Sequence, residues 1–175
     1  MQKKLKKLKR QLKGKNGMRL ALYQPDIPQN TGTLLRLGAC LDLEIDIIEP
    51  CGFIFNEKAM RRAGMDYLDF AKYQKHKSWD SFLEYRKNHP DEYGRIILLT
   101  TKGQTSFVEF DFKKNDIILM GRESAGVPEA IHNLADAQLI IPMNPEARSI
   151  NMAISASMAI TEALRQTNSF PKINK

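Results

Sequence analysis

The chain of 175 residues carries 27 Lys and Arg against 20 Asp and Glu, a formal net charge of +7, and 42% of its residues are hydrophobic. This length and composition are typical of one globular domain. No apolar run approaches the roughly 18 residues that span a bilayer, and no signal-peptide pattern is present, so we expect a cytoplasmic protein without a membrane partner. The two Cys and three His residues match no zinc or redox pattern.

Residues 1–17 account for the basic character of the chain. They hold eight Lys and Arg and no acidic residue, and the rest of the chain has 19 basic against 20 acidic residues, a net charge of −1. Leu5, Leu8 and Leu12 recur at helical spacing and indicate an amphipathic helix for a membrane surface or for RNA phosphates. A solvated, frayed extension is the alternative. We therefore divide the chain into a basic extension, 1–17, and one domain, 18–170.

Short β-rich runs alternate with helical patterns along that domain. Strands are predicted near 18–23, 44–48, 69–73, 95–100, 116–120 and 137–141, and helices over 31–41, 56–63, 78–88, 128–134 and 150–166. The alternation predicts a three-layer α/β fold with a mostly parallel sheet. Ligands of such sheets bind beyond the carboxyl ends of the strands, so we expect the site in the loops after Tyr23, Thr100, Met120 and Ile141.

The loop after the first strand reads QPDIPQNTGTLLR. Asn30 or Thr31 is predicted to cap the following helix, which carries Arg36. Polar groups near a helix start, together with a guanidinium, suit a phosphate or a hydroxyl group. A helix cap and an unrelated surface Arg are the alternative interpretation.

The loop after the strand DIILM reads GRESAGVP, in which Gly121 and Gly126 flank Glu123. Val127 and Pro128 stand where a phosphate-binding P-loop has its Lys and Ser or Thr, and the dinucleotide pattern G-x-G-x-x-G is missing. This excludes the usual ATP, GTP and dinucleotide sites. The glycines instead favour a backbone turn that passes close to a different ligand.

Residues 141–160 read IPMNPEARSINMAISASMAI. Pro142 and Pro145 prevent regular structure in the loop, and its short polar side chains predict a binding segment that holds a ligand largely by backbone groups. The helix that follows has almost no polar residue, so we expect it to be covered on most sides. A central core helix of an ordinary α/β domain is the alternative.

Two basic clusters are candidates for RNA contact. The first comprises Lys58, Arg61 and Arg62 beside the aromatic residues Phe53, Phe55 and Tyr67; the second comprises Lys72, Lys75, His76 and Lys77. Aromatic rings stack unpaired bases, and cations bind phosphates. The alternative is that the Phe residues belong to the core and that the lysines form a solvated face.

Three segments in order, NTGTLLR at 30–36, GRESAGVP at 121–128 and IPMNPEARSINMAISASMAITEALR at 141–165, resemble the motifs of the SPOUT-class RNA 2′-O-methyltransferases. The segment IIEPCGFIFNEKAMRRAGMDY at 47–67 resembles the branch that methylates the ribose of the wobble pyrimidine in certain leucine tRNAs. The resemblance covers residues 18–166. It implies a deep trefoil knot near the C-terminus, a homodimer with the cofactor cleft near the subunit interface, tRNA as partner and S-adenosylmethionine as cofactor.

The resemblance also implies roles for individual residues. Catalytic, hydroxyl-facing roles fall to Arg36, Asn30, Glu123, Ser149 and Asn151. The cofactor-binding positions are Leu99, Thr100, Thr101, Gly103, Met120, Gly121, Gly126, Ile141, Met143, Ser149 and Met152, with Glu123 beside them. A guanidinium stays protonated and is a poor general base, so we expect Arg36 to act by positioning and charge stabilisation.

Other functions remain as alternatives. A noncatalytic RNA-binding or ribosome-associated module would use the tail and the basic clusters without needing the 121–128 and 142–151 loops. A methyltransferase of the same class acting on another RNA would need both loops. A nucleotide-binding switch or reductase would require a phosphate-binding pattern, which this chain lacks.

Overall fold

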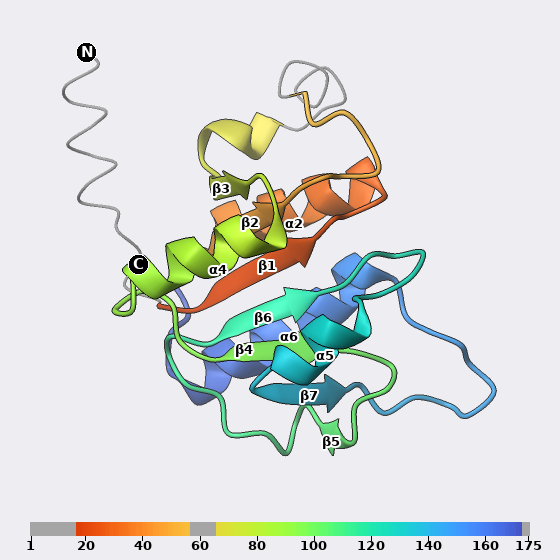
Figure 1. Cartoon of the computed structure of the whole chain (residues 1–175). Helices are drawn as coiled ribbons and strands as arrows, with labels where there is room; N and C mark the ends of the chain where they lie inside the picture. The colour runs from red at the N-terminus through yellow and green to blue at the C-terminus, as the bar shows by residue number, and fades with distance from the viewer. Residues whose placement is uncertain (1–16, 57–65, 173–175) are drawn as a thin grey trace, which may run out of the picture.

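The computed structural model describes residues 17–56 and 66–172, which contain one sheet of seven strands in the order β3-β2-β1-β6-β4-β7-β5 (Figure 1). The strands are β1 (Arg19–Tyr23), β2 (Glu44–Ile48), β3 (Lys72–His76), β4 (Ile96–Leu99), β5 (Thr105–Ser106), β6 (Ile117–Met120) and β7 (Ala137–Ile140). Every strand pair in this sheet is parallel. The carboxyl ends of the strands therefore meet at one edge, as predicted.

Helices cover both faces of the sheet. They are α2 (Pro28–Leu41), α4 (Trp79–Asn88), α5 (Glu129–Leu134) and α6 (Met152–Gln166), and a 3-10 turn, η1, spans Asp66–Asp69. Leu34 of α2 and Ala156 of α6 belong to one apolar cluster, whereas Phe82 of α4 and Ile131 of α5 belong to another on the opposite face. The predicted three-layer architecture is confirmed. No helix in 17–56 or 66–172 is long and apolar enough to cross a membrane.

Several predicted boundaries are wrong. The strand expected at 69–73 is β3 at Lys72–His76, because Asp69 still belongs to η1, Phe70 lies exposed in the turn after it, and the edge strand itself is polar. The two-residue strand β5 has too little sequence for a periodic pattern and was not predicted. The helix expected at 56–63 and the extension 1–17 lie, except for Asn56 and Gly17, outside the described residues.

Helix α2 also begins earlier than predicted. Its first residue is Pro28, whose missing N–H costs nothing at this position, and the N-cap residue Ile27 makes no side-chain hydrogen bond. Asn30 and Thr31 therefore lie within the first turn, and the predicted capping role of either residue is wrong. The Asn30 side chain is free for a tertiary contact.

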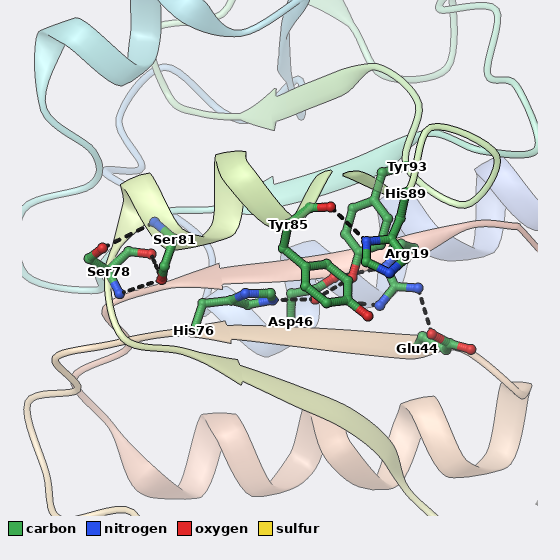
Figure 2. A network of polar contacts seen from close by, with 9 residues as sticks. All are labelled: Arg19, Glu44, Asp46, His76, Ser78, Ser81, Tyr85, His89 and Tyr93. Carbon is green, nitrogen blue, oxygen red and sulfur yellow. Dashed lines mark hydrogen bonds and ion pairs between the residues drawn. The ribbon is translucent and has the colours of Figure 1, made fainter. Parts of the chain in front are cut away.

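A buried polar cluster joins the first three strands to the segment around α4 (Figure 2). The Asp46 carboxylate on β2 is fully buried and accepts hydrogen bonds from Arg19 Nε at 2.9 Å and from the Tyr93 hydroxyl at 2.8 Å. His76 Nε2 on β3 lies 2.7 Å from the same carboxylate. Arg19 also contacts Glu44, and its guanidinium lies 4.0 Å from the centre of the Tyr93 ring. Asp46 thus ties β1, β2 and β3 together.

The charge of Asp46 has a direct consequence for stability. Burial by itself raises the pKa of this carboxyl, but the hydrogen bond with His76 and the charge of Arg19 outweigh burial and lower the pKa below its usual value. A carboxylate with a lowered pKa stabilises the fold fully above its unfolded-state pKa of about 4. That contribution is lost as the pH falls through the lower folded-state value.

We expect Asp46→Ala to reduce the free energy of unfolding by about 3–5 kcal/mol at neutral pH, because it leaves the buried Arg19 guanidinium without its main partner. Urea unfolding followed by circular dichroism measures this difference. Glu84→Ala, which removes an exposed carboxylate from α4, is the matched control and should stay within about 0.5 kcal/mol of wild type. The effect of Asp46→Ala should shrink below about pH 4, and an effect independent of pH would contradict the ionic role.

Candidate functional site

A cavity of about 410 Å³ lies at the carboxyl edge of the sheet. It is bounded by the loops after β1, β4, β6 and β7 and by the start of α6, so the loops predicted to form the site do converge. Its size falls in the range of small-molecule sites, roughly 300–1,000 Å³. The lining residues are Ile27, Asn30, Leu98, Leu99, Thr100, Thr101, Met120, Gly121, Arg122, Glu123, Gly126, Val127, His132, Ile140, Ile141, Met143, Arg148, Ser149, Ile150, Asn151, Met152 and Ser155.

A chain of hydrogen bonds crosses the cavity wall and connects three segments that are distant in sequence. Asn30 Nδ2 donates to Glu123 Oε1 at 3.0 Å, and Asn151 Nδ2 donates to Asn30 Oδ1 at 3.1 Å. The Asn151 side-chain oxygen in turn accepts from the backbone N–H groups of Ala153 and Ile154 and caps α6. Glu123 is the acidic residue of this lining, and a carboxylate oxygen that already accepts one hydrogen bond has a second lone pair that can accept another from a ligand hydroxyl.

The loop that carries Glu123 is a closed turn. Arg122 and Gly126 exchange backbone hydrogen bonds of 3.0 and 2.9 Å across it, and Gly126 has a φ of +67°, which favours glycine. A Cβ added to Gly121 would lie 2.6 Å from the backbone carbon of Gly126. Both glycines are therefore required by the turn itself, and they let a backbone segment border the cavity.

A second polar group ties the same turn to the loop after β1. The Asp26 carboxylate accepts hydrogen bonds from Arg122 Nη2 at 2.8 Å and from the Ser124 backbone N–H at 3.1 Å. The hydrogen bond from Arg122, followed by that from Ser124, lowers the pKa of Asp26 to about 2. The backbone N–H of Asp26 donates to Glu123 Oε2 at 2.8 Å. Both oxygens of Glu123 are thus held by protein donors.

Most of the predicted site residues meet in this cavity. Asn30, Glu123, Ser149 and Asn151 line it, and so do all the predicted cofactor-binding residues except one: Leu99, Thr100, Thr101, Met120, Gly121, Gly126, Ile141, Met143, Ser149 and Met152. Gly103 does not line the cavity, since its Cα packs against the backbone of Leu139 and Ile140. Arg36 also lies outside the lining and is exposed on α2.

Comparison with known proteins defines the family. Residues 17–161 match the SpoU rRNA Methylase family. The chain belongs to that family. A tRNA (cytidine(34)-2'-O)-methyltransferase from Ancylobacter novellus is 52% identical over 153 residues, which cover 87% of this chain and 95% of the relative.

Two solved structures place the fold of this SpoU family member among methyltransferases. One, described as "Structural insights into the 2-OH methylation of C/U34 on tRNA", is 36% identical with a TM-score of 0.77, covering 85% of this chain and 95% of the other. The SpoU methyltransferase AviRb from Streptomyces viridochromogenes, solved in complex with the cofactor AdoMet, has a TM-score of 0.76 at 20% identity. It covers 90% of this chain and 63% of its own, and at this identity it shows the fold alone.

Several cavity residues of this SpoU family member escaped the sequence analysis. Arg122 and Arg148 lie inside motifs that were singled out, but their neighbours Glu123 and Ser149 received the roles. His132 on α5 lines the cavity too, with Nδ1 3.4 Å from Gln138 Oε1. The sequence around His132 did not indicate a functional role, because a single His in a short amphipathic segment is more often a core residue.

The basic clusters predicted for RNA contact are only partly described. Lys58, Arg61, Arg62 and the Tyr67 side chain lie outside the described residues. In the second cluster, Lys72 pairs with Asp42, Lys75 pairs with Glu49, and His76 is buried against Asp46. That cluster is therefore not a free cationic patch, because Lys72 and Lys75 are ion-paired within the fold and His76 is buried. Phe55 packs against the core and against Tyr73, which agrees with the alternative interpretation for this ring.

The outer face of α6 forms the wall of a separate groove. Ile154 and Met158 are 57% and 37% exposed, and Val108 opposite them is 55% exposed. The inner face is buried, since Ala153, Ala156 and Ala159 pack under the sheet. The expectation that α6 is covered on most sides thus holds for the inner face and fails, within the described part of this single chain, for the outer one. Thr33 of α2, one helical turn before Arg36, lines the same groove.

Proposed function

We propose that this protein transfers a methyl group from S-adenosylmethionine to the ribose 2′-oxygen of the wobble pyrimidine, nucleotide 34, of tRNA. The proposal rests on the site, where Asn30, Glu123 and Asn151 from three separate motifs form one hydrogen-bonded wall of a ligand-sized cavity. It is supported by 52% identity to a relative of that activity. Because the segment 47–67 resembles the branch that acts on certain leucine tRNAs, we propose leucine tRNAs as substrates. We propose the cytoplasm as the location of the reaction.

The size and lining of the cavity suit S-adenosylmethionine. Apolar residues at the strand ends, such as Leu99, Met120 and Ile141, line it together with the glycine turn. The bound cofactor supplies a methyl carbon activated by a positive sulfonium. Met143 and Met152 add polarisable side chains to the same lining.

The protein contributes orientation, charge and exclusion of water to the reaction. In the reaction the ribose 2′-oxygen would bond to the methyl carbon as the carbon–sulfur bond breaks to leave a thioether, and the hydroxyl proton would be released to water. Glu123 is the acidic residue of the lining, and we propose that it accepts the hydrogen bond of the attacking hydroxyl and so aligns the oxygen. Asn151 belongs to the same hydrogen-bonded wall through Asn30, and Ser149 also lines the cavity.

Cations at the cavity are proposed to hold the RNA backbone. Arg148 lines the cavity mouth and is exposed, which suits a contact to the phosphate beside the target nucleotide. Arg122 is already paired with Asp26. The basic extension 1–17 adds charge that can bind phosphates elsewhere on the tRNA.

The function is tested with labelled S-adenosylmethionine and unmodified bulk tRNA, followed by nuclease digestion and mass spectrometry of the nucleosides. We expect a 2′-O-methylated pyrimidine that maps to position 34. Transfer to another nucleotide would identify a different RNA target, and absence of cofactor binding in calorimetry would favour a noncatalytic RNA-binding module.

We also propose that two copies associate through the groove formed by Val108, Ile154 and Met158. Exposed apolar side chains clustered on one helix face are a common mark of a protein interface. Because Thr33 lines the groove and Arg36 lies one turn further along α2, a second copy seated there would cover the region between Arg36 and the groove. Arg36 does not line the cavity of its own chain. In such a dimer it would lie beside the subunit contact, where it could act on the bound RNA.

We expect Ile154→Glu combined with Met158→Glu to convert a dimer into a monomer, because two buried charges at the centre of an apolar interface are not compensated. Size-exclusion chromatography with light scattering measures the mass directly. Gln104→Glu, on an exposed residue outside the groove, is the control. A wild-type protein that is monomeric at micromolar concentration would contradict the proposal.

We expect Arg36→Ala to reduce turnover at least about a hundred-fold while the affinity for S-adenosylmethionine changes no more than a few-fold, because the guanidinium acts on the RNA and on developing charge. Steady-state kinetics and calorimetry provide the two readouts. Arg36→Lys keeps the charge but loses the planar fork, so it should recover only part of the rate. Near-normal turnover by Arg36→Ala would rule out a catalytic Arg36.

The resemblance to SPOUT proteins also leads us to propose the deep trefoil knot. It is supported by the contacts of the last helix with the connection between β5 and β6. Gln166 at the end of α6 accepts a hydrogen bond from the Phe112 backbone and donates one to the Phe110 carbonyl. Phe107 and Phe112 of that connection share a core with α6.

A further inference from the structure

Asp26 does not line the cavity, yet it contacts three consecutive residues of the turn that does. Its carboxylate accepts hydrogen bonds from Arg122 Nη2 at 2.8 Å, from Arg122 Nε at 3.2 Å and from the Ser124 hydroxyl at 2.5 Å and backbone N–H at 3.1 Å. Its backbone N–H donates to Glu123 Oε2 at 2.8 Å. A single residue on the loop after β1 therefore fixes both neighbours of Glu123 and Glu123 itself.

Asp26 is held firmly in its turn. The Gly52 N–H donates to the Pro25 carbonyl at 2.9 Å, and Gly52 packs so closely that a Cβ added there would lie 3.0 Å from Asp26 Cα and 2.8 Å from its Oδ1. The loop after β2 thus limits movement of Asp26 away from the glycine turn. Asp26 therefore keeps a fixed position against the glycine turn.

The charges of the region explain why a carboxylate is needed at this position. Arg122 is adjacent to Glu123 in the chain, and an unpaired guanidinium beside a cavity carboxylate would compete with the substrate for it. Asp26 binds this guanidinium instead, and the second oxygen of Glu123 is held by Asn30. Because the pKa of Asp26 is lowered to about 2, the carboxylate stays charged throughout the neutral pH range.

We propose that Asp26 is a positioning residue, which holds the Glu123 carboxylate in the cavity against the target hydroxyl and keeps Arg122 away from it. The inference rests on the function proposed above. Asp26 does not touch the reacting atoms. Displacement of a reacting group by about 1 Å can cost roughly a hundred-fold in rate, so the residue should affect the rate of the chemical step more than ligand binding.

Steady-state methylation of tRNA by wild type, Asp26→Ala and Asp26→Asn provides the first test. Asp26→Ala keeps the backbone N–H to Glu123 but removes the carboxylate that holds Arg122 and Ser124, so we expect it to lower kcat about a hundred-fold and to leave KM for S-adenosylmethionine within about three-fold. The kcat of Asp26→Asn should lie between those of wild type and Asp26→Ala. The Asn side-chain oxygen can still accept from Arg122, but its NH₂ group would face the N–H and O–H donors of Ser124. Asp91→Ala removes an exposed carboxylate outside the site and should match wild type.

A double-mutant cycle separates positioning from a structural role. In a Glu123→Gln background, single-turnover transfer of labelled methyl should fall less than about three-fold further on adding Asp26→Ala, because the residue acts through Glu123. A full hundred-fold loss in both backgrounds would overturn the proposal. A parallel loss of melting temperature and cofactor affinity in Asp26→Ala would overturn it too, since the turn would then simply have collapsed. Wild type in the same assay reports separately on the proposed function, which fails if no methyl is transferred.

Discussion

The parallel pairing of all the described strands is the constraint on which the rest of the structure depends. It brings the chain out of every strand at the same edge, so segments as distant as residues 24–27 and 141–151 become neighbours. After β1 the chain enters α2 on one face of the sheet, whereas after the adjacent strand β6 it enters α5 on the other face. Ligands of open α/β sheets usually occupy the crevice at such a divergence. Here Asp26, Arg122 and Ser124 bridge the diverging loops, and the cavity extends from there toward β4, β7 and α6.

The two polar clusters of the fold follow the same physical rule with different results. Asp46 is buried among Arg19, His76 and Tyr93 on the α4 side of the sheet, where its partners compensate the cost of burial and link strands. Glu123 is held by equally specific donors but borders a cavity. A carboxylate surrounded by protein on every side contributes to stability; one that keeps an open side is available to a ligand.

The residue pattern was sufficient to predict the layer architecture and the strand-end loops, because glycine, proline and short polar residues after apolar strands have few structural uses. The individual lining residues came from the resemblance to the SPOUT class. The residue pattern was insufficient where a residue acts through tertiary contacts. The residues alone indicated a helix cap at Asn30 or Thr31, and only the resemblance gave Asn30 a role in the site. The Asn30 amide in fact binds Glu123, 93 positions away in the chain. The polar strand β3 carries no apolar signal, since its pairing with β2 and the contact of His76 with Asp46 define it. The groove on α6 was not predicted, because an apolar helix pattern does not reveal which face another chain would cover.

The closed glycine turn also sets the way in which this segment can change during evolution. Both ends of the turn require glycine, since Gly121 has no room for a side chain and Gly126 has a left-handed backbone conformation. Ala125 between them is exposed. Within the turn, position 125 can therefore tolerate other side chains more readily than Gly121 or Gly126. A substitution at position 122, by contrast, requires a matching change at position 26, so these two positions are expected to vary as a pair across descendants of this chain.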